Sequence, residues 1–351
     1  MDQMKTAVAL AAITTVAAVL AAPCAPYTVQ DCKGYNSWPM MQAVGRRLVC
    51  TYSRGTGHNI AEGVRGVFAR TSDDCGSTWS REICVADAPD YGEVPIGKGL
   101  DADGAMLLWV RCFGGPNNRH DLYRTADGVT FAKLSTPALS PLPVQITDIF
   151  HVPGRGMMAL WFAGNYKDDA SHSWGTLVSA DNGRTWTQTT VEKDLSKADW
   201  PTEQAAAYVG DGKILAIART EIPGSAGGVQ FQLTSSDRGA TWKRERTNIS
   251  DIMCSTPTLV YDEQSGLVSN YYFERGKGLV KRRVNAVVEV WSAPTGWSAP
   301  EIVGAGSERP WDTGNVNATV IGGTHYIAYY SGTAPDTAVY ALPVPVPVRG
   351  K

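Results

Sequence analysis

Ser179-Ala180-Asp181-Asn182-Gly183-Arg184-Thr185-Trp186 is one of three stretches of this chain that follow the pattern S-x-D-x-G-x-T-W. The other two are Ser72–Trp79 and Ser235–Trp242, and weaker copies occupy Thr125–Phe131 and Ser292–Trp297. The central aspartates of the first four copies stand at positions 74, 127, 181 and 237, so the steps between them are 53, 54 and 56 residues. A regular period of this length predicts a repeat architecture.

Each copy has the chemistry of a tight turn between two β-strands. Asp and Ser side chains hydrogen-bond to their own turn backbone, and Gly accepts a positive φ at little cost. The Thr-Trp pair then begins the next strand with a large apolar side chain. We therefore expect these turns to organise the fold and to take no part in catalysis.

Six similar strands follow one another at steps of about 50 to 60 residues, most of them introduced by a Gly-containing turn. One strand for each blade predicts an all-β, six-bladed β-propeller over residues 27–351. The six predicted strands are 47–52, 106–111, 156–162, 213–219, 267–273 and 324–330.

Residues 1–22 differ sharply in composition from the rest of the chain. A short polar start is followed by the apolar run Thr6–Ala22, which ends in the small residues of Val19-Leu20-Ala21. This order is typical of a secretory signal, so we expect a signal peptide or apolar leader and a secreted, cell-surface or periplasmic protein. A buried Ala-rich helix is the alternative.

The bulk composition excludes several classes of function. A net charge of −2 gives no overall positive field for nucleic acid. The seven cysteines contain no C-x2-C spacing, and no phosphate-binding, dinucleotide or serine-hydrolase motif occurs. We expect no metal, no cofactor, no nucleic-acid partner and no membrane contact of the mature form, and the oligomeric state stays open. Cys75 and Cys84 are close enough in sequence for a local disulfide if the protein is exported.

The S-x-D-x-G-x-T-W turns on six predicted blades resemble the Asp-box turns of the sialidase superfamily, and the resemblance covers nearly all of residues 27–351. It implies a glycosidase, either an exo-alpha-sialidase or an endosialidase, whose partner is a sialylated or other acidic glycan. Sialic acid carries a carboxylate on its anomeric carbon, and the planar fork of Arg matches a carboxylate bidentately. Arg side chains on the inner strands are therefore the first residues to find.

The resemblance implies four catalytic residues. Glu203 and Arg219 stand 16 residues apart and look like the family's Glu-then-Arg pair across one hairpin. Arg275 ends the corresponding strand of the next predicted blade. His58 follows an inner strand in a Gly-flanked loop, where a histidine is suited to proton transfer or to binding a sugar. Solvated strand ends and a surface loop are the alternatives for these side chains.

Two departures from the exo-acting pattern are informative. Asn36-Ser37-Trp38-Pro39 has no Arg where the family's first arginine precedes a proline, and 311–318 has no nucleophilic Tyr. Both losses resemble the phage endosialidases, as do the aromatic pair Tyr35 and Trp38 and the histidine that follows it. This resemblance favours cleavage within polysialic acid by a mechanism without a Tyr nucleophile. If such a nucleophile exists, Tyr271 and Tyr272 are the first candidates.

Five further residues are expected to bind substrate around this centre. Tyr35 and Trp38 would form aromatic walls of the cleft, Arg54 and Glu62 share the loop of His58, and Arg119 would line an acidic-sugar subsite. The function implied is hydrolysis of sialic-acid or related acidic-sugar linkages. A non-catalytic carbohydrate-binding propeller is the main alternative, and a polysaccharide lyase is the weaker one.

Overall fold

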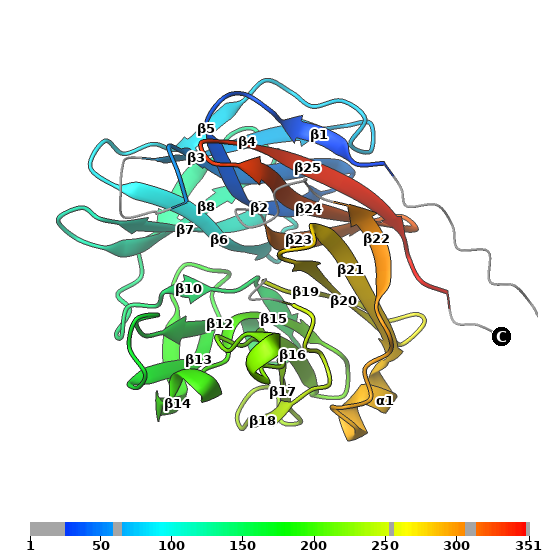
Figure 1. Cartoon of the computed structure of the whole chain (residues 1–351). Helices are drawn as coiled ribbons and strands as arrows, with labels where there is room; N and C mark the ends of the chain where they lie inside the picture. The colour runs from blue at the N-terminus through cyan, green and yellow to red at the C-terminus, as the bar shows by residue number, and fades with distance from the viewer. Residues whose placement is uncertain (1–24, 59–64, 253–255, 306–313, 349–351) are drawn as a thin grey trace, which may run out of the picture.

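The chain is an all-β propeller, in which antiparallel sheets are arranged around a common centre (Figure 1). The computed structural model describes residues 25–58, 65–252, 256–305 and 314–348. Within these ranges the elements other than strands are one short helix, α1 (Val287–Ser292), and two 3-10 turns, Lys197–Asp199 and Gly224–Ala226. No helix in this part of the chain is long and apolar enough to cross a membrane. The leader predicted for residues 1–22 lies outside the described residues.

Four blades stand as separate sheets, three of four strands and one of five. Each is a set of neighbouring antiparallel strands in chain order, except that β11 pairs beside β10 on the same strand, β12. Their strands are β6 (Gly92–Leu100), β7 (Met106–Phe113), β8 (Arg119–Thr125) and β9 (Ala132–Ser135); β10 (Gln145–Ile146), β11 (Phe150–Val152), β12 (Gly156–Ala163), β13 (His172–Ser179) and β14 (Thr187–Leu195); β15 (Thr202–Tyr208), β16 (Ile214–Arg219), β17 (Phe231–Ser235) and β18 (Lys243–Arg246); and β19 (Thr258–Asp262), β20 (Leu267–Glu274), β21 (Leu279–Ala286) and β22 (Glu301–Ala305).

The two ends of the chain form one continuous eight-stranded sheet. Its order is β23-β24-β25-β2-β3-β4-β5, and β1 pairs with β25. Its strands are β1 (Tyr27–Gln30), β2 (Tyr35–Val44), β3 (Arg47–Gly55), β4 (Gly66–Ser72), β5 (Ile83–Ala86), β23 (Gly314–Ile321), β24 (Thr324–Thr333) and β25 (Asp336–Pro345).

The prediction of six blades is therefore wrong, whereas that of an all-β propeller is confirmed. All six strands expected from the sequence exist, as β3, β7, β12, β16, β20 and β24. Counting one blade for each of them failed because β3 and β24 belong to the same sheet. A parallel pairing between Tyr35 on β2 and Thr337 on β25 joins them. A local sequence pattern cannot show that two residues 302 positions apart in the chain pair within one sheet.

Two buried side chains reinforce this junction between the ends of the chain. The Asn36 amide lies 2.7 Å from the Thr337 carbonyl, and the Thr337 hydroxyl donates to the Asn36 carbonyl at 2.6 Å. The same amide lies 2.8 Å from the carbonyl of Cys32. Both junction residues are buried. Loss of this amide would leave buried carbonyls without their donor, which costs more than an exposed hydrogen bond does.

The repeated turns connect the third and fourth strands of their blades and are held by one recurring set of hydrogen bonds. In Ser179–Trp186, the Ser179 hydroxyl donates to Asp181 at 2.9 Å and accepts from the Gly183 amide at 2.9 Å. The Thr185 amide and hydroxyl both donate to Asp181, at 2.8 and 2.6 Å. These bonds hold the pKa of the Asp181 carboxyl below its usual range. The same bonds recur in the copies at 72–79 and 235–242.

Trp186 and Trp242 pack between neighbouring blades, whereas Trp79 packs within the eight-stranded sheet. Trp186 lies against Trp109, with ring centroids 5.2 Å apart, and Trp242 lies against the buried Trp174 at 5.7 Å. Hydrophobic clusters of this kind fill each blade-to-blade contact. Cys75 and Cys84 are both free, so the local disulfide considered from the sequence does not form.

We expect Asn36→Ala to lower the free energy of unfolding by about 1–3 kcal/mol, the usual cost of leaving a buried hydrogen-bonding group unsatisfied. Urea denaturation followed by tryptophan fluorescence measures this change. Asn117→Ala is the matched control because Asn117 is exposed, and it should leave the midpoint unchanged. Equal stability of both variants would show that the junction does not hold the two ends together.

Candidate functional site

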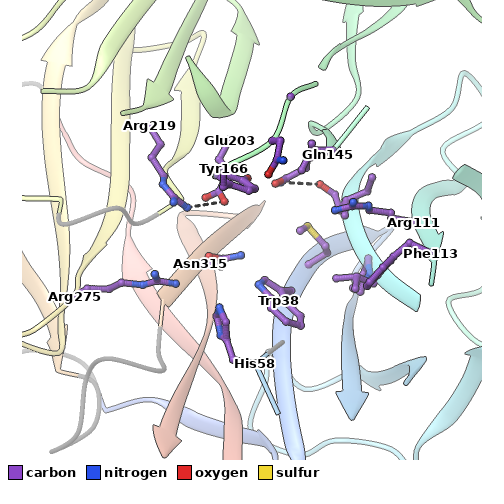
Figure 2. A pocket seen from close by; sticks show the side chains of 17 residues that line it. Trp38, His58, Arg111, Phe113, Gln145, Tyr166, Glu203, Arg219, Arg275 and Asn315 are labelled. Atoms are coloured by element: carbon purple, nitrogen blue, oxygen red, sulfur yellow. Dashed lines mark hydrogen bonds and ion pairs between the residues drawn. The ribbon is translucent and has the colours of Figure 1, made fainter. Parts of the chain in front are cut away.

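A pocket of about 590 Å³ opens where the first strands of several sheets converge (Figure 2). Its walls come from both ends of the chain and from the blades between them. The structure brings Glu203, Arg219, Arg275, Trp38 and His58 together here. The tryptophans of the repeated turns do not line it, in agreement with their role in packing.

The inner strands place three of the lining side chains by the same backbone device. Trp38 on β2, Glu203 on β15 and Asn315 on β23 have φ values of 50°, 44° and 48°. Each lies where the pairing with the next strand shifts register, which marks a β-bulge. A positive φ in a residue other than glycine costs energy, and bulges re-aim side chains beside functional sites. The repetition therefore indicates that these three positions serve the pocket.

Glu203 is the second residue of β15, and two partners hold its carboxylate. The Arg219 guanidinium lies 2.6 Å from Oε1, and the Thr256 hydroxyl donates to Oε2. Thr256 also lies 2.8 Å from Oδ1 of Asn315. The second nitrogen of Arg219 contacts Glu221 at 3.1 Å, and Thr202 donates to Glu221 at 2.6 Å. Glu203 is therefore oriented from both of its oxygens.

Arg275 follows β20 and enters the pocket from the same side as Arg219 (Figure 2). Its neighbour Glu274 is buried outside the pocket lining and pairs with Lys281 at 2.5 Å. This follows because successive side chains of a strand point to opposite faces of the sheet. Gly314 makes room for the guanidinium, because a Cβ at that position would stand 3.0 Å from Nε of Arg275. Gly314 also has a φ of 147°, which only glycine adopts readily.

His58 lies across the pocket from Glu203 (Figure 2). Tyr35 and Trp38 contact its imidazole ring. The Tyr35 hydroxyl is 2.6 Å from Nδ1 of His58, and Trp38 packs against the imidazole with centroids 5.4 Å apart. Tyr35 is fully buried, so it holds the histidine and does not form a wall of the cleft. Arg65 lies over the Trp38 ring at 4.9 Å, and burial lowers its pKa to about 10.

The wall opposite Arg219 and Arg275 carries a third arginine that the sequence analysis missed. Arg111 is half-buried near the end of β7 and lies over the Phe113 ring, 4.8 Å from its centroid. Burial lowers the pKa of Arg111, and the nearby Tyr166 partly offsets this effect. The sequence did contain a signal, since Met106–Arg111 ends in Arg as Lys213–Arg219 does.

Tyr166 is the second missed residue and reaches the pocket from the loop after β12. Burial of its hydroxyl raises the pKa of Tyr166, and the charge of Glu203 raises it further. Among the described lining residues it is the single tyrosine. No pattern marked it, because its loop approaches Glu203 only through the packing of neighbouring blades.

Several predicted residues lie outside the pocket lining. Arg54 pairs with Glu82 at 2.7 Å, and Arg119 pairs with Asp121 at 3.1 Å. Glu62 lies outside the described residues. The fallback nucleophiles are fully buried in other contacts: the Tyr271 hydroxyl lies 2.7 Å from Nδ1 of His325, and that of Tyr272 donates to Asp251 at 3.0 Å.

Comparison with known proteins defines the class of fold. No protein-family model matches the chain, and no curated protein sequence matches it. Among solved structures, a protein of unknown function from Dyadobacter fermentans is similar over 92% of this chain and 99% of its own, with 16% identity and a TM-score of 0.73. The endosialidase of phage phi92 matches over 93% and 70%, with 11% identity and a TM-score of 0.69.

A sialidase from Trypanosoma rangeli, solved as a covalent intermediate with 2,3-difluorosialic acid, matches over 90% of this chain and 56% of its own, with 12% identity and a TM-score of 0.65. At such identities the likeness shows the fold alone. The chain has a β-propeller fold of the kind found in sialidases and an endosialidase.

His120 on β8 is buried and pairs with Arg111 on β7. Because of this burial, the free energy of unfolding depends on pH. Burial and the Arg111 charge lower the pKa of His120 to about 3. The unfolded chain takes up this proton near pH 6.5. Below that pH the unfolded state therefore binds more protons, and stability falls by up to about 1.4 kcal/mol per pH unit for each such histidine.

We expect His120→Leu to flatten the decline in unfolding free energy between pH 6.5 and 4.5. Urea titrations at several pH values measure the slope. His151→Gln is the control because His151 is exposed on β11, and its slope should match the parent's. Equal slopes for His120→Leu and the parent would contradict a neutral buried His120.

Proposed function

We propose that the protein is a glycoside hydrolase that cleaves linkages of sialic acid or a related acidic sugar. The observation that carries the proposal is the presence of Arg219, Arg275 and Glu203 in one pocket. Three arginines and one glutamate give its lining a formal charge of +2, with His58 neutral, in a chain whose net charge is −2. A local positive field of this kind favours an anionic ligand.

Arg219 and Arg275 hold the substrate carboxylate in this proposal. A guanidinium provides a planar pair of donors that matches a carboxylate, and both groups enter from the same side of the pocket (Figure 2). Because the carboxylate of sialic acid is attached to the anomeric carbon, this contact places the reacting centre beside Glu203. Fixing the reacting atoms in this way supplies much of the barrier reduction in enzymes.

Glu203 activates a water molecule for attack on the anomeric carbon. Each carboxylate oxygen has a second acceptor position, so the bonds from Arg219 and Thr256 leave Glu203 able to accept a proton from water. His58 acts as the acid in its imidazolium form, in which both ring nitrogens carry a proton. The Tyr35 hydroxyl, 2.6 Å from Nδ1, orients the ring. The Nε2 proton passes to the leaving oxygen as its bond to the sugar breaks, which leaves a neutral imidazole.

The positions of acid and base favour inversion of the anomeric carbon. Glu203 and His58 stand on opposite sides of the pocket (Figure 2). An inverting glycosidase needs this arrangement, with water on one face of the sugar and the leaving group on the other. The aromatic support of His58 by Tyr35 and Trp38 favours an endo-acting enzyme, as the resemblance to endosialidases implies.

A carbohydrate-binding propeller without turnover is the second candidate. The existing ion pair between Arg219 and Glu203 is the observation that favours it, since such a pair fixes the arginine for binding without chemistry. The strained backbone at Glu203 favours the hydrolase, because strain persists where it serves function. A lyase is separated from both by the unsaturated product that it would release.

We expect Glu203→Gln to lower the turnover of polysialic acid or a small sialoside by about 10²–10⁴-fold, the usual contribution of a general base. Released sialic acid and oligomer length are the measurements. Glu245→Gln is the matched control, because Glu245 pairs with Lys243 on the outer strand β18. Binding without turnover in the parent protein would favour the carbohydrate-binding alternative, and unsaturated ends would favour the lyase.

The stereochemistry of the first product tests the proposed mechanism. We expect proton NMR at early times to show the inverted anomer, because water attacks directly. A retained anomer would contradict this mechanism and require a nucleophile. Tyr166 is then the residue to replace, because it lines the pocket near Glu203.

A further inference from the structure

Arg111 differs from the other strand-end arginines in its electrostatic surroundings. Arg54, Arg119 and Arg219 each contact a carboxylate within 3.1 Å. Within the described part of the chain, Arg111 forms no ion pair with any acidic residue. Its guanidinium therefore brings positive charge to the pocket without a protein counterion there.

The two residues paired with Arg111 on the neighbouring strands carry no negative charge. Its paired neighbours are Val94 on β6 and His120 on β8, the latter buried and neutral. The Phe113 ring provides a further apolar contact at 4.8 Å. Burial lowers the pKa of Arg111, so the charged form is poorly hydrated. A cation in such surroundings is costly unless a counterion joins it.

The position of Arg111 separates it from the proposed carboxylate site. It faces the pocket from the wall opposite Arg219 and Arg275, with Trp38 lying between the two walls (Figure 2). Gln145 and Tyr166 line the pocket near Arg111 and add hydrogen-bonding groups. A volume of about 590 Å³ falls in the range of sites that enclose a whole small ligand, so one ligand can reach both walls.

We propose that Arg111 binds a second anionic group of the same ligand, separate from the carboxylate that Arg219 and Arg275 hold. This inference rests on the proposed function and narrows its substrate class to glycans with at least two negative groups. The second group is the carboxylate of an adjacent acidic sugar or a sulfate ester. Either provides the oxygen fork that a guanidinium binds.

Titration calorimetry with three ligands tests the proposal, using a Glu203→Gln background to prevent turnover. The ligands are a sialoside with one carboxylate, an α2,8-linked sialic acid dimer, and a sulfated form of the first sialoside. We expect Arg111→Gln to weaken binding of the dimer or the sulfated sialoside by roughly tenfold or more, as loss of a charged hydrogen bond implies. Binding of the singly charged sialoside should change less than threefold.

Two further variants make the result specific. Arg246→Gln is the matched control, since Arg246 also lies over a phenylalanine ring, at 5.4 Å from Phe231, and is outside the pocket. It should leave binding of all three ligands unchanged. Arg111→Lys keeps the charge and should retain part of the preference for doubly charged ligands, which also guards against misfolding of the glutamine variant.

The outcomes distinguish this inference from the proposed function. An effect confined to the dimer identifies a carboxylate as the second group, and one confined to the sulfated sialoside identifies a sulfate. Equal loss for all three ligands, or no loss, overturns the role of Arg111 and leaves the proposed function standing. If the Arg111-intact protein binds none of the ligands, the proposed function fails and this inference fails with it.

Discussion

The pairing of the two chain ends is the constraint on which the rest of the molecule depends. β1 adds to β25, and β25 meets β2 through Tyr35 and Thr337, so one sheet contains strands from both termini. The pocket needs this closure because Trp38 and His58 come from the start of the chain and Arg275 and Asn315 from near its end. Without it, the proposed acid and base would have no common ligand to act on.

Within the closed ring, backbone conformation decides which side chains reach the centre. Regular strands would point alternate residues toward and away from a neighbouring sheet. The bulges at Trp38, Glu203 and Asn315 break that alternation near the starts of β2, β15 and β23. Each of the three residues has a positive φ, which costs energy. The turns with S-x-D-x-G-x-T-W lie between outer strands and supply packing, so stability and function occupy different parts of each blade.

Charge is distributed unequally between the two walls of the pocket. On one wall Arg219 is matched by Glu203 and Glu221, and both carboxylates help to orient it. On the other wall Arg111 has no acidic partner among the described residues, and its neighbours include the Phe113 ring, Val94 and the neutral imidazole of His120. A ligand with one negative group satisfies only part of this field. The difference arises from tertiary packing, because the two arginines end similar strands with similar local sequences.

The sequence by itself determined the all-β propeller class and the six strands later seen as β3, β7, β12, β16, β20 and β24, because turn chemistry and strand period are local features. The association of Glu203, Arg219 and Arg275 was expected from the resemblance to the sialidase superfamily, and all three line the pocket. Only the tertiary structure decided that β3 and β24 share a sheet, which made the count of six blades wrong. It also moved Arg54 and Arg119 out of the pocket lining and brought Arg111 and Tyr166 into it. The physical reason is that sheet pairing between distant residues and the choice of an ion-pair partner depend on distances in space, which no local pattern of residues records.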